Sequence, residues 1–244
     1  SMLKYVGKNF KNVIVLINSV NVMELTFLET IPGLDACLVV GGTGTRAASG
    51  IPSLLYGEVS PSGKLADTYA YELESNVNYN NVGFDGVVLY DNEGQGLYPQ
   101  GVKLNSLPET AKGPMYSDYV EGIYVGYKWY ETADVEGIWS GKTRKVLDES
   151  DKSVTVNGYD AVVQYPFGYG LSYSHFEWTL SNVSLKQGSA IEQDTQLEFT
   201  IQVLNNGAMP AKDVVELYLT APYTDGEIEK SHVSLIGYEK TGTI

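Results

Sequence analysis

Residues Gly42–Ala47 are the stretch whose types and spacing best suit a cofactor-binding turn. They read Gly-Thr-Gly-Thr-Arg-Ala and fit the pattern G-x-G-x-x-A. When such a turn follows a strand and opens a helix, its glycines let the backbone approach a pyrophosphate at the helix N-terminus. The acid expected about 20 residues later would be Asp67, but Asp67 follows the turn-like Pro61–Gly63 instead of ending a strand. A tight turn explains the glycines more simply, so no cofactor is assigned.

Carboxylates and histidines are the other side chains that could carry chemistry. The chain has 30 Asp and Glu residues, and only the geometry of a site justifies a catalytic role for any one of them. His175 and His232 have no metal-ligand spacing, so they are expected at the surface or in the core, and no metal site is predicted. Asn182–Ser184 matches the N-glycosylation sequon, although it falls in a predicted strand.

The charge balance argues against two classes of partner. The formal net charge is -14, whereas binding to nucleic acid or to anionic membranes depends on clustered Lys and Arg. Neutral ligands such as sugars are compatible with this charge. The single cysteine, Cys37, lies in an apolar run and is expected in the core, so no internal disulfide forms. No apolar run reaches the roughly 18 residues of a membrane span, and the sequence leaves the compartment and the oligomeric state open.

Alternating strands and helices are expected at the start of the chain. Val13–Ile17 and Ala36–Val40 are continuous apolar runs, typical of parallel strands that are buried on both faces. Helical spacing is found in Met23–Thr30, and a second helix is predicted from Arg46 to Tyr56, where Gly57 would end it. This order is the βαβ rhythm of an α/β fold.

The middle of the chain has less regular periodicity. Leu65–Tyr71 is predicted to be extended, and Asn76–Pro114 is expected to form a long loop rich in Asn, Gly and Pro. Glu121–Tyr130 is predicted to be a turn that leads into a short aromatic helix. Lys142–Gly158 is polar and is expected to be mobile.

A change of period marks a second body. Tyr165–Tyr173, with one Pro and two Gly among its aromatic residues, is predicted to be a rigid connector. Beyond it, apolar and polar residues alternate, as in antiparallel sheets with one buried face. Because an immunoglobulin-like sandwich needs about seven strands, four strands are expected to form an incomplete module. The predicted strands cover Phe176–Ser181, Leu197–Val203, Val214–Leu219 and His232–Tyr238, with a turn at Asn206–Gly207.

Six segments, in order, resemble the C-terminal half of family 3 glycoside hydrolases, the β-glucosidase and β-xylosidase group. Together they are spread over nearly the whole chain, which makes the resemblance specific. The matching segments are Asn12–Asn18, Gly41–Gly44, Leu55–Leu65, Glu121–Tyr127, Pro166–Tyr173, and Val203–Gly207 with Val214–Tyr218.

The resemblance implies a fold and a division into domains. Residues 1–171 are similar to the C-terminal α/β-sandwich domain of the family, a partial parallel-sheet sandwich with flavodoxin-like layering whose N-terminal part is missing. Residues 172–244 are similar to the start of its fibronectin type III-like domain, a partial antiparallel β-sandwich whose last strands are missing. The fold class expected is therefore α/β followed by an immunoglobulin-like β-sandwich.

The resemblance also implies retaining hydrolysis. In that chemistry one carboxylate attacks the anomeric carbon and a second protonates the leaving oxygen, with the two about 5–5.5 Å apart. In the family the nucleophile is typically an Asp of a barrel domain, and the acid/base is a Glu that precedes the strand matching Val13–Ile17. Both therefore lie outside this sequence, and no catalytic or substrate-binding residue is assigned. Glu58 and Glu121 lie inside matching segments and are interpreted as structural hydrogen-bonding residues.

The sequence supports three hypotheses for function. The leading one is a part of a retaining β-glycosidase that is inactive alone and supplies scaffold and a candidate wall of the cleft. Its partners would be the barrel domain of the same protein and, through the whole enzyme, a β-linked oligosaccharide or glycoside. The second is a carbohydrate-binding or assembly module that uses the aromatic Tyr116–Tyr130 region, including Tyr124, Trp129 and Tyr130. The third is nucleotide binding at Gly42–Ala47.

Overall fold

The structure is a computed structural model that describes residues 1–44, 48–79, 119–192 and 194–244. Most of the predicted loop Asn76–Pro114, the start of the helix predicted from Arg46, and the first three residues of the Tyr116–Tyr130 region lie outside these residues. In the described part the strands pair in five two-stranded sheets, one parallel and four antiparallel. The fold class is therefore α/β followed by antiparallel β, as predicted.

The chain begins with helix α1 (Met2–Asn9) and a parallel pair, β1 (Ile14–Ile17) and β2 (Ala36–Val39). Both strands were predicted, but burial of β1 on both faces was wrong. Ile14 and Leu16 are 48% and 43% exposed, because no described element covers their face, whereas Ile17 is buried against Leu25.

The helix after β1 is shorter than predicted, and the helical segment after β2 is described only in part. In place of a helix over Met23–Thr30 there is a single 3-10 turn, η1 (Thr26–Glu29). Ser19 Oγ donates to Asn21 O and accepts the Asn21 N–H in a turn that ends two residues before the predicted helix. After β2 come η2 (Ala48–Gly50) and α3 (Ile51–Leu55), and Gly57 at φ +71° ends the helical segment as expected.

An aromatic core holds the middle of the chain together. Strand β3 (Tyr69–Ala70) and η3 (Leu73–Ser75) precede the undescribed residues, and α4 (Tyr127–Val135) follows them. The predicted extended segment Leu65–Tyr71 is a strand only at β3, which pairs with β6 (Val163–Tyr165). The core formed at this place contains Ala70, Tyr130, Ala133, Trp139, Val162 and Val163.

The polar stretch Lys142–Gly158 was predicted to be mobile, and this prediction was wrong. It forms an antiparallel hairpin, β4 (Thr143–Leu147) and β5 (Ser153–Asn157), followed by η5 (Gly158–Ala161). Asp148 holds the hairpin turn, since its Oδ1 accepts the backbone N–H groups of Ser150 and Lys152. Val146 is buried beneath it. One buried residue in a polar stretch is too weak a pattern to predict a hairpin from sequence.

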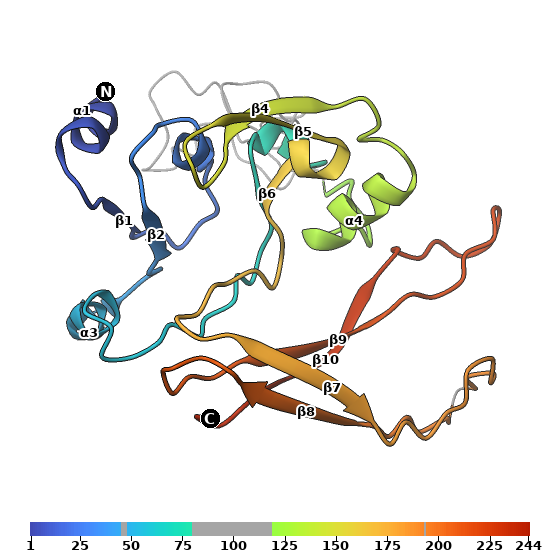
Figure 1. The fold of residues 1–244 in the computed structure, drawn as a ribbon. Coiled ribbons are helices and arrows are strands. Elements are labelled where there is room, and N and C mark those ends of the chain that lie inside the picture. The colour runs from blue at the N-terminus through green and yellow to red at the C-terminus, as the bar shows by residue number, and fades with distance from the viewer. Residues whose placement is uncertain (45–47, 80–118, 193) are drawn as a thin grey trace, which may run out of the picture.

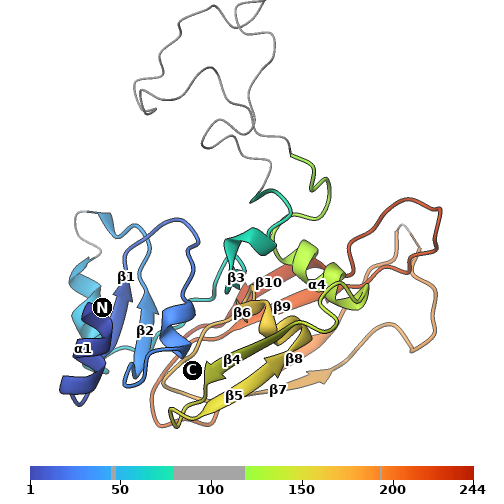
Figure 2. The same cartoon turned by 90° about the horizontal axis from the view of Figure 1, so that it is seen from above.

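The last four strands form two antiparallel pairs, as the alternation predicted. In the first pair, β7 (Phe176–Ser181) lies beside β8 (Thr200–Asn205), which starts three residues later than predicted. In the second, β9 (Val214–Leu219) lies beside β10 (Ser234–Lys240). The two pairs lie one behind the other (Figures 1 and 2), and an apolar groove of about 420 Å³ between them is lined from β8 by Ile201 and Val203 and from β9 by Val215 and Leu217.

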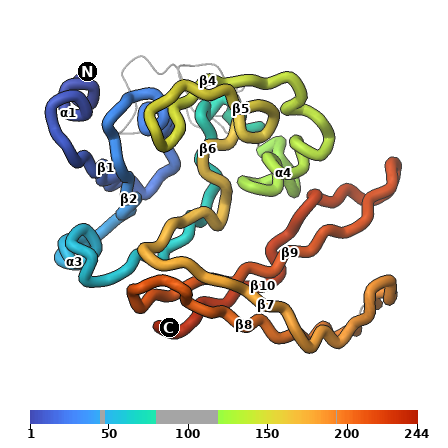
Figure 3. The backbone as a smooth tube through the Cα atoms, in the orientation of Figure 1, coloured from blue at the N-terminus to red at the C-terminus, as the bar shows by residue number. Residues whose placement is uncertain are grey.

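The chain divides into two bodies with a short connection. The α/β body is residues 1–165, and the β module is residues 176–244. In Figure 3 the chain between them, residues 166–175, passes from the upper body to the lower strands beside the earlier segment that leads out of α3. The two bodies therefore meet where these two segments run side by side.

Candidate functional site: the seam between the two bodies

The two carboxylates inside the matching segments do not form a pair. Glu58 follows α3 and is exposed, and its Oε2 accepts the hydroxyl of Ser53 at 2.8 Å. Glu121 precedes α4, and its Oε2 is buried with no hydrogen-bond partner in the described part of the chain. Helices α3 and α4 lie far apart in Figure 1. The elements next to the two residues are therefore apart, whereas a retaining pair requires close approach.

The predicted nucleotide-binding turn is described only up to Gly44. It follows β2, and Gly41 and Gly44 have φ of +60° and +58°, which suits a tight turn. Arg46 and Ala47 lie outside the described residues. Asp67 is exposed and accepts the backbone N–H of Thr68, two residues before β3, instead of ending a strand. Its position does not match the acid of a dinucleotide-binding unit.

The two histidines are isolated from each other and from metal ligands. His175 is exposed, and its carbonyl accepts the backbone N–H of Asn206, which lies in the predicted turn. The backbone N–H of His232 donates to Thr132 Oγ1. Within the described residues no group of three or more His, Cys, Asp or Glu could hold a metal ion. No helix of this part is long and apolar enough to cross a bilayer.

The sequon residue Asn182 lies just beyond β7 rather than inside a strand. It is exposed and has φ of +53°, a conformation that Asn tolerates better than most residues. Its side-chain amide lies 3.4 Å from Thr200 Oγ1.

The aromatic residues proposed to bind sugar belong largely to the core. Tyr130 is 3% exposed, and its backbone carbonyl accepts the indole N–H of Trp139. Trp129 packs edge-on against Trp139, with ring centroids 5.9 Å apart, and its own indole N–H donates to Ser75 O. Tyr124 stays partly exposed. Because Trp129 and Tyr130 are used in packing, they do not form an open platform for sugar rings.

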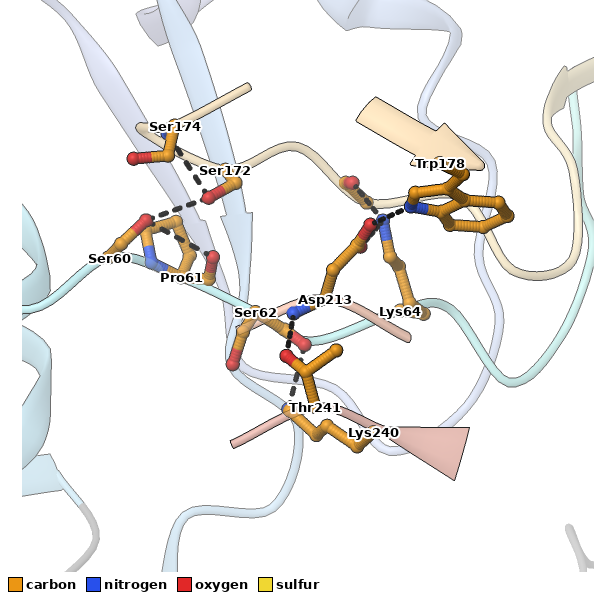
Figure 4. A network of polar contacts seen from close by, with 11 residues as sticks. Ser60, Pro61, Ser62, Lys64, Ser172, Ser174, Trp178, Asp213, Lys240 and Thr241 are labelled. Atoms are coloured by element: carbon orange, nitrogen blue, oxygen red, sulfur yellow. Dashed lines mark hydrogen bonds and ion pairs between the residues drawn. The ribbon is translucent and has the colours of Figure 1, made fainter. Parts of the chain in front are cut away.

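The described residues instead bring the matching segments together at one place, which we call the seam. Its first half is formed by the turn 60–65 and the connector 166–174. Leu65 donates its N–H to Tyr169 O and accepts the N–H of Gly168, both at 2.8 Å. Ser60 Oγ lies 2.8 Å from Ser172 Oγ (Figure 4). Ser60 Oγ also accepts the N–H of Tyr173. Two segments that are distant in sequence are thus held like neighbouring strands.

Two glycines of the connector are needed for this close approach. A Cβ on Gly170 would overlap Gly63 O, and a Cβ on Gly168, which has φ of +79°, would overlap the carboxylate of Glu216. At Gly170 the overlap is with backbone, so a side chain there would push the connector away from the turn. At Gly168 the positive φ disfavours any other residue, and the Glu216 side chain would also have to move. The glycines that mark the motif are therefore explained by packing.

The polar centre of the seam is Asp213, immediately before β9. Its side chain is 8% exposed, and its Oδ1 lies 3.5 Å from Lys64 Nζ. Its Oδ2 accepts the indole N–H of Trp178 at 2.9 Å, and its backbone N–H donates to Thr241 Oγ1 (Figure 4). A buried carboxylate is tolerated only when it is paired and hydrogen-bonded, and here the carboxylate finds its partners in the turn and in β7, while the backbone of Asp213 bonds the segment that follows β10.

Lysine side chains extend this centre across both bodies. Lys64 Nζ also donates to Gly170 O at 2.8 Å, so the same ammonium contacts the connector and Asp213. Lys240, the last residue of β10, donates from Nζ to Ser62 O at 2.8 Å. Each lysine therefore joins the turn 60–65 to the β module.

The second half of the seam is aromatic and centres on the first residue of α4. The Tyr127 ring packs against Phe167 at 4.6 Å and edge-on against Tyr218 at 6.1 Å, and its hydroxyl accepts the N–H of Leu235 at 2.8 Å. Tyr218 donates its own hydroxyl to Glu216. Burial, followed by this hydrogen bond, raises the pKa of Tyr218, so the phenol stays neutral and remains a donor.

The seam can position segments, and the described residues that form it contain no arrangement of nucleophile and base. Four segments of the seam were predicted as motifs, but Asp213 was not, because it lies just before the motif Val214–Tyr218 and outside it. Lys64 was visible only as part of the turn Pro61–Leu65. The pair joins residues that are far apart along the chain, and no periodicity reports such a contact.

Comparison with known proteins agrees with the motif evidence. A sequence model described as the glycosyl hydrolase family 3 C-terminal domain matches residues 1–127. Beta-glucosidase A of Butyrivibrio fibrisolvens is 29% identical over 248 residues, covering 98% of this chain and 24% of the relative. A beta-glucosidase of Ruminococcus albus is 28% identical over 241 residues, covering 99% of this chain and 19% of the relative.

Solved structures show the same relationship. A beta-glucosidase from Paenibacillus barengoltzii matches with a TM-score of 0.66 and 27% identity, covering all of this chain and 20% of that one. Beta-glucosidase 3B from Thermotoga neapolitana in complex with glycerol matches with a TM-score of 0.66 and 25% identity, covering all of this chain and 26% of that one. The chain thus spans about a quarter or less of the length of these two structures, and the same holds for the two relatives compared by sequence.

Proposed function

Because this chain belongs to glycoside hydrolase family 3, as part of its C-terminal region, we propose that it is the supporting part of a retaining β-glycosidase of the β-glucosidase type. The bond-breaking carboxylates are supplied by other parts of the enzyme, including a barrel domain. The substrate proposed for the whole enzyme is a β-linked glycoside. Alone, the chain does not turn over substrate.

The observation that carries this proposal is the separation of the elements next to Glu58 and Glu121, the two acids inside the matching segments. Glu58 follows α3 and Glu121 precedes α4, and these two helices lie far apart in Figure 1. Each of two surface grooves has one carboxylate in its lining, Glu227 in the loop 226–230 and Glu239 in the groove of the β module. A retaining mechanism needs two carboxylates that face one anomeric carbon.

The division into domains proposed for the chain is residues 1–171 and 172–244. It is supported by the strand pairing, because in the described residues each strand before the connector pairs with another strand before it, and each strand after the connector pairs with another strand after it. The connector itself lies between β6 and β7. The first domain corresponds to the later part of an α/β sandwich, and the second to the start of a fibronectin type III-like module.

The test is an activity assay of the purified chain with aryl β-glucosides and aryl β-xylosides. We expect hydrolysis at the level of the buffer blank, with a complete family 3 β-glucosidase as the positive control. Turnover above the blank that disappears in Glu58→Gln or Glu121→Gln would show that the chain has its own catalytic carboxylate and would refute the proposal. If turnover survives both substitutions, size exclusion decides its source. Activity that elutes apart from the chain belongs to a contaminating hydrolase, and activity that elutes with the chain would also refute the proposal.

A further inference from the structure

The strands in the described part of this chain form only two-stranded sheets, which are not expected to be stable on their own. The β module consists of two two-stranded pairs with an open groove between them, and β1–β2 is also a two-stranded sheet. An isolated pair of strands is at best marginally stable in water. The β module therefore depends on what it packs against, and its described residues meet the α/β body at the seam.

One residue of the seam contacts three separate parts of the chain. Asp213 is paired with Lys64 from the turn before β3, with Trp178 from β7, and with Thr241 from the segment after β10. Thr241 returns a second bond, since its N–H donates to Asp213 O at 2.9 Å. The same residue thus joins β7, the β9–β10 pair and the α/β body.

Burial makes this contact an all-or-none one. If the two bodies separate, Asp213 and Lys64 lose each other together with the Gly170 carbonyl that Lys64 holds. If the two bodies stay together, the Asp213 carboxylate, which is 8% exposed, must keep its contacts with Lys64 and Trp178, because a buried unpaired charge is unfavourable. An intermediate in which the β module is folded but undocked would leave Asp213 without its cation.

We propose that Asp213 acts as a lock that couples the β module to the α/β body, so that the two open as one cooperative unit. The lock acts through the Lys64 pair and fixes the turn 60–65 and the connector in one arrangement. This inference concerns the mechanics of the chain and is independent of the reaction that the whole enzyme catalyses.

Hydrogen exchange of the whole chain, followed by mass spectrometry of peptides from each strand pair, tests the lock. In the unmodified chain we expect the slowest amides of β3–β6 and of β9–β10 to exchange at similar rates, through shared opening. In Asp213→Asn, which keeps the shape and removes the charge, we expect the amides of β7–β10 to exchange at least about tenfold faster, while those of β4–β5 change much less.

Controls separate the lock from general loss of stability. Asp225→Asn removes an exposed carboxylate from the β9–β10 loop of the same module and should leave the exchange pattern unchanged. Lys64→Met removes the ammonium from the other body and should reproduce the effect of Asp213→Asn, and it decides the question if Asp213→Asn does not fold. Two results would overturn the inference. The first is that the two bodies of the unmodified chain exchange their slowest amides at different rates. The second is that Asp213→Asn and Lys64→Met accelerate exchange equally in both bodies.

Discussion

The rings of Tyr127 and Phe167 pack with their centroids 4.6 Å apart and tilted by 32°, although a long stretch of chain separates them in sequence. Tyr127 opens α4 and Phe167 lies in the connector, so this contact joins two of the segments by which the family was recognised. The hydroxyl of Tyr127 reaches further and accepts the N–H of Leu235 in β10. One side chain thus contacts the connector and, with Tyr218 and Leu235, both strands of the β9–β10 pair.

Tyr127→Phe should lower the free energy of unfolding by about 1 kcal/mol, because it removes one hydrogen-bond acceptor and keeps the ring. Tyr127→Ala should lower it by roughly 3 kcal/mol, since the packing against Phe167 and Tyr218 is also lost. Urea unfolding followed by circular dichroism measures both values. Tyr56→Phe, at a tyrosine that is 84% exposed, is the matched control and should have no effect. Equal losses for Tyr127→Phe and Tyr127→Ala would contradict a role for the ring.

Gly170→Ala should destabilise the chain by roughly 1–3 kcal/mol, because its new Cβ overlaps Gly63 O and pushes the connector off the turn. The natural control is Gly63→Ala in the facing segment, where a Cβ meets nothing within 4 Å. Thermal unfolding of the two variants side by side measures the difference. A Gly63→Ala variant that lost as much stability as Gly170→Ala would show that the close approach described for the seam is not the cause.

Arg144 docks the β4–β5 hairpin that sequence reasoning missed. Its Nε donates to Ala161 O at 3.0 Å, and its guanidinium lies 4.6 Å from the centroid of the Tyr71 ring. Arg144 also forms an ion pair with Glu72, whose side chain is largely exposed, so that pair alone should contribute little to the free energy of unfolding.

Arg144→Met should therefore lower the free energy of unfolding by about 1–2 kcal/mol, from the lost hydrogen bond and cation–π contact. Glu72→Gln should change it by less than about 0.5 kcal/mol. Lys145→Met, at the exposed neighbouring position of β4, controls for loss of a positive charge from the hairpin. Chemical denaturation gives the three values, and a larger effect for Glu72→Gln than for Arg144→Met would assign the docking to the ion pair instead.

Cys37 provides a pH-dependent prediction. Burial in β2 raises the pKa of its thiol from 9.0 to about 11. Because the thiolate is the reactive form, alkylation at pH 8 should be roughly 100-fold slower in the folded chain than in urea, as expected for two pKa units. The rate in the folded chain should keep rising up to pH about 11. Cys37→Ala should show no labelling at any pH, and labelling of the folded chain that levels off near pH 9 would disprove the shift.

The same shift predicts how stability depends on pH. The thiol binds its proton more tightly in the folded chain, so its stabilising contribution is complete below pH 9 and is lost as pH rises from 9 to about 11. Burial also raises the pKa values of Tyr71, Tyr159 and Tyr165, which act in the same direction at higher pH. We expect the melting temperature to fall steadily above pH 9, and to fall less between pH 9 and 11 in Cys37→Ala. An unchanged slope in that variant would remove Cys37 from the account.

The sequence alone determined the elements whose signal is local. The apolar run of β1 and the two-residue alternation of β7 and β9 predict strands because each residue's neighbours set its face, and the family followed from short segments in a fixed order. It also placed the catalytic acids outside the chain, an expectation that the glycoside assay tests.

Tertiary structure decided what depends on contacts between distant residues. Lys142–Gly158 became a hairpin whose Arg144 bonds Ala161 and Glu72 elsewhere in the fold and whose Val146 is buried. Trp129 and Tyr130 became core residues instead of a sugar platform because Trp139 and Ser75 lie against them. Asp213, inconspicuous in sequence, became the centre of the seam. The periodicity of a segment indicates which of its faces is buried. It does not indicate which distant residue pairs with a buried charge, because that partner is set by the packing of the whole chain.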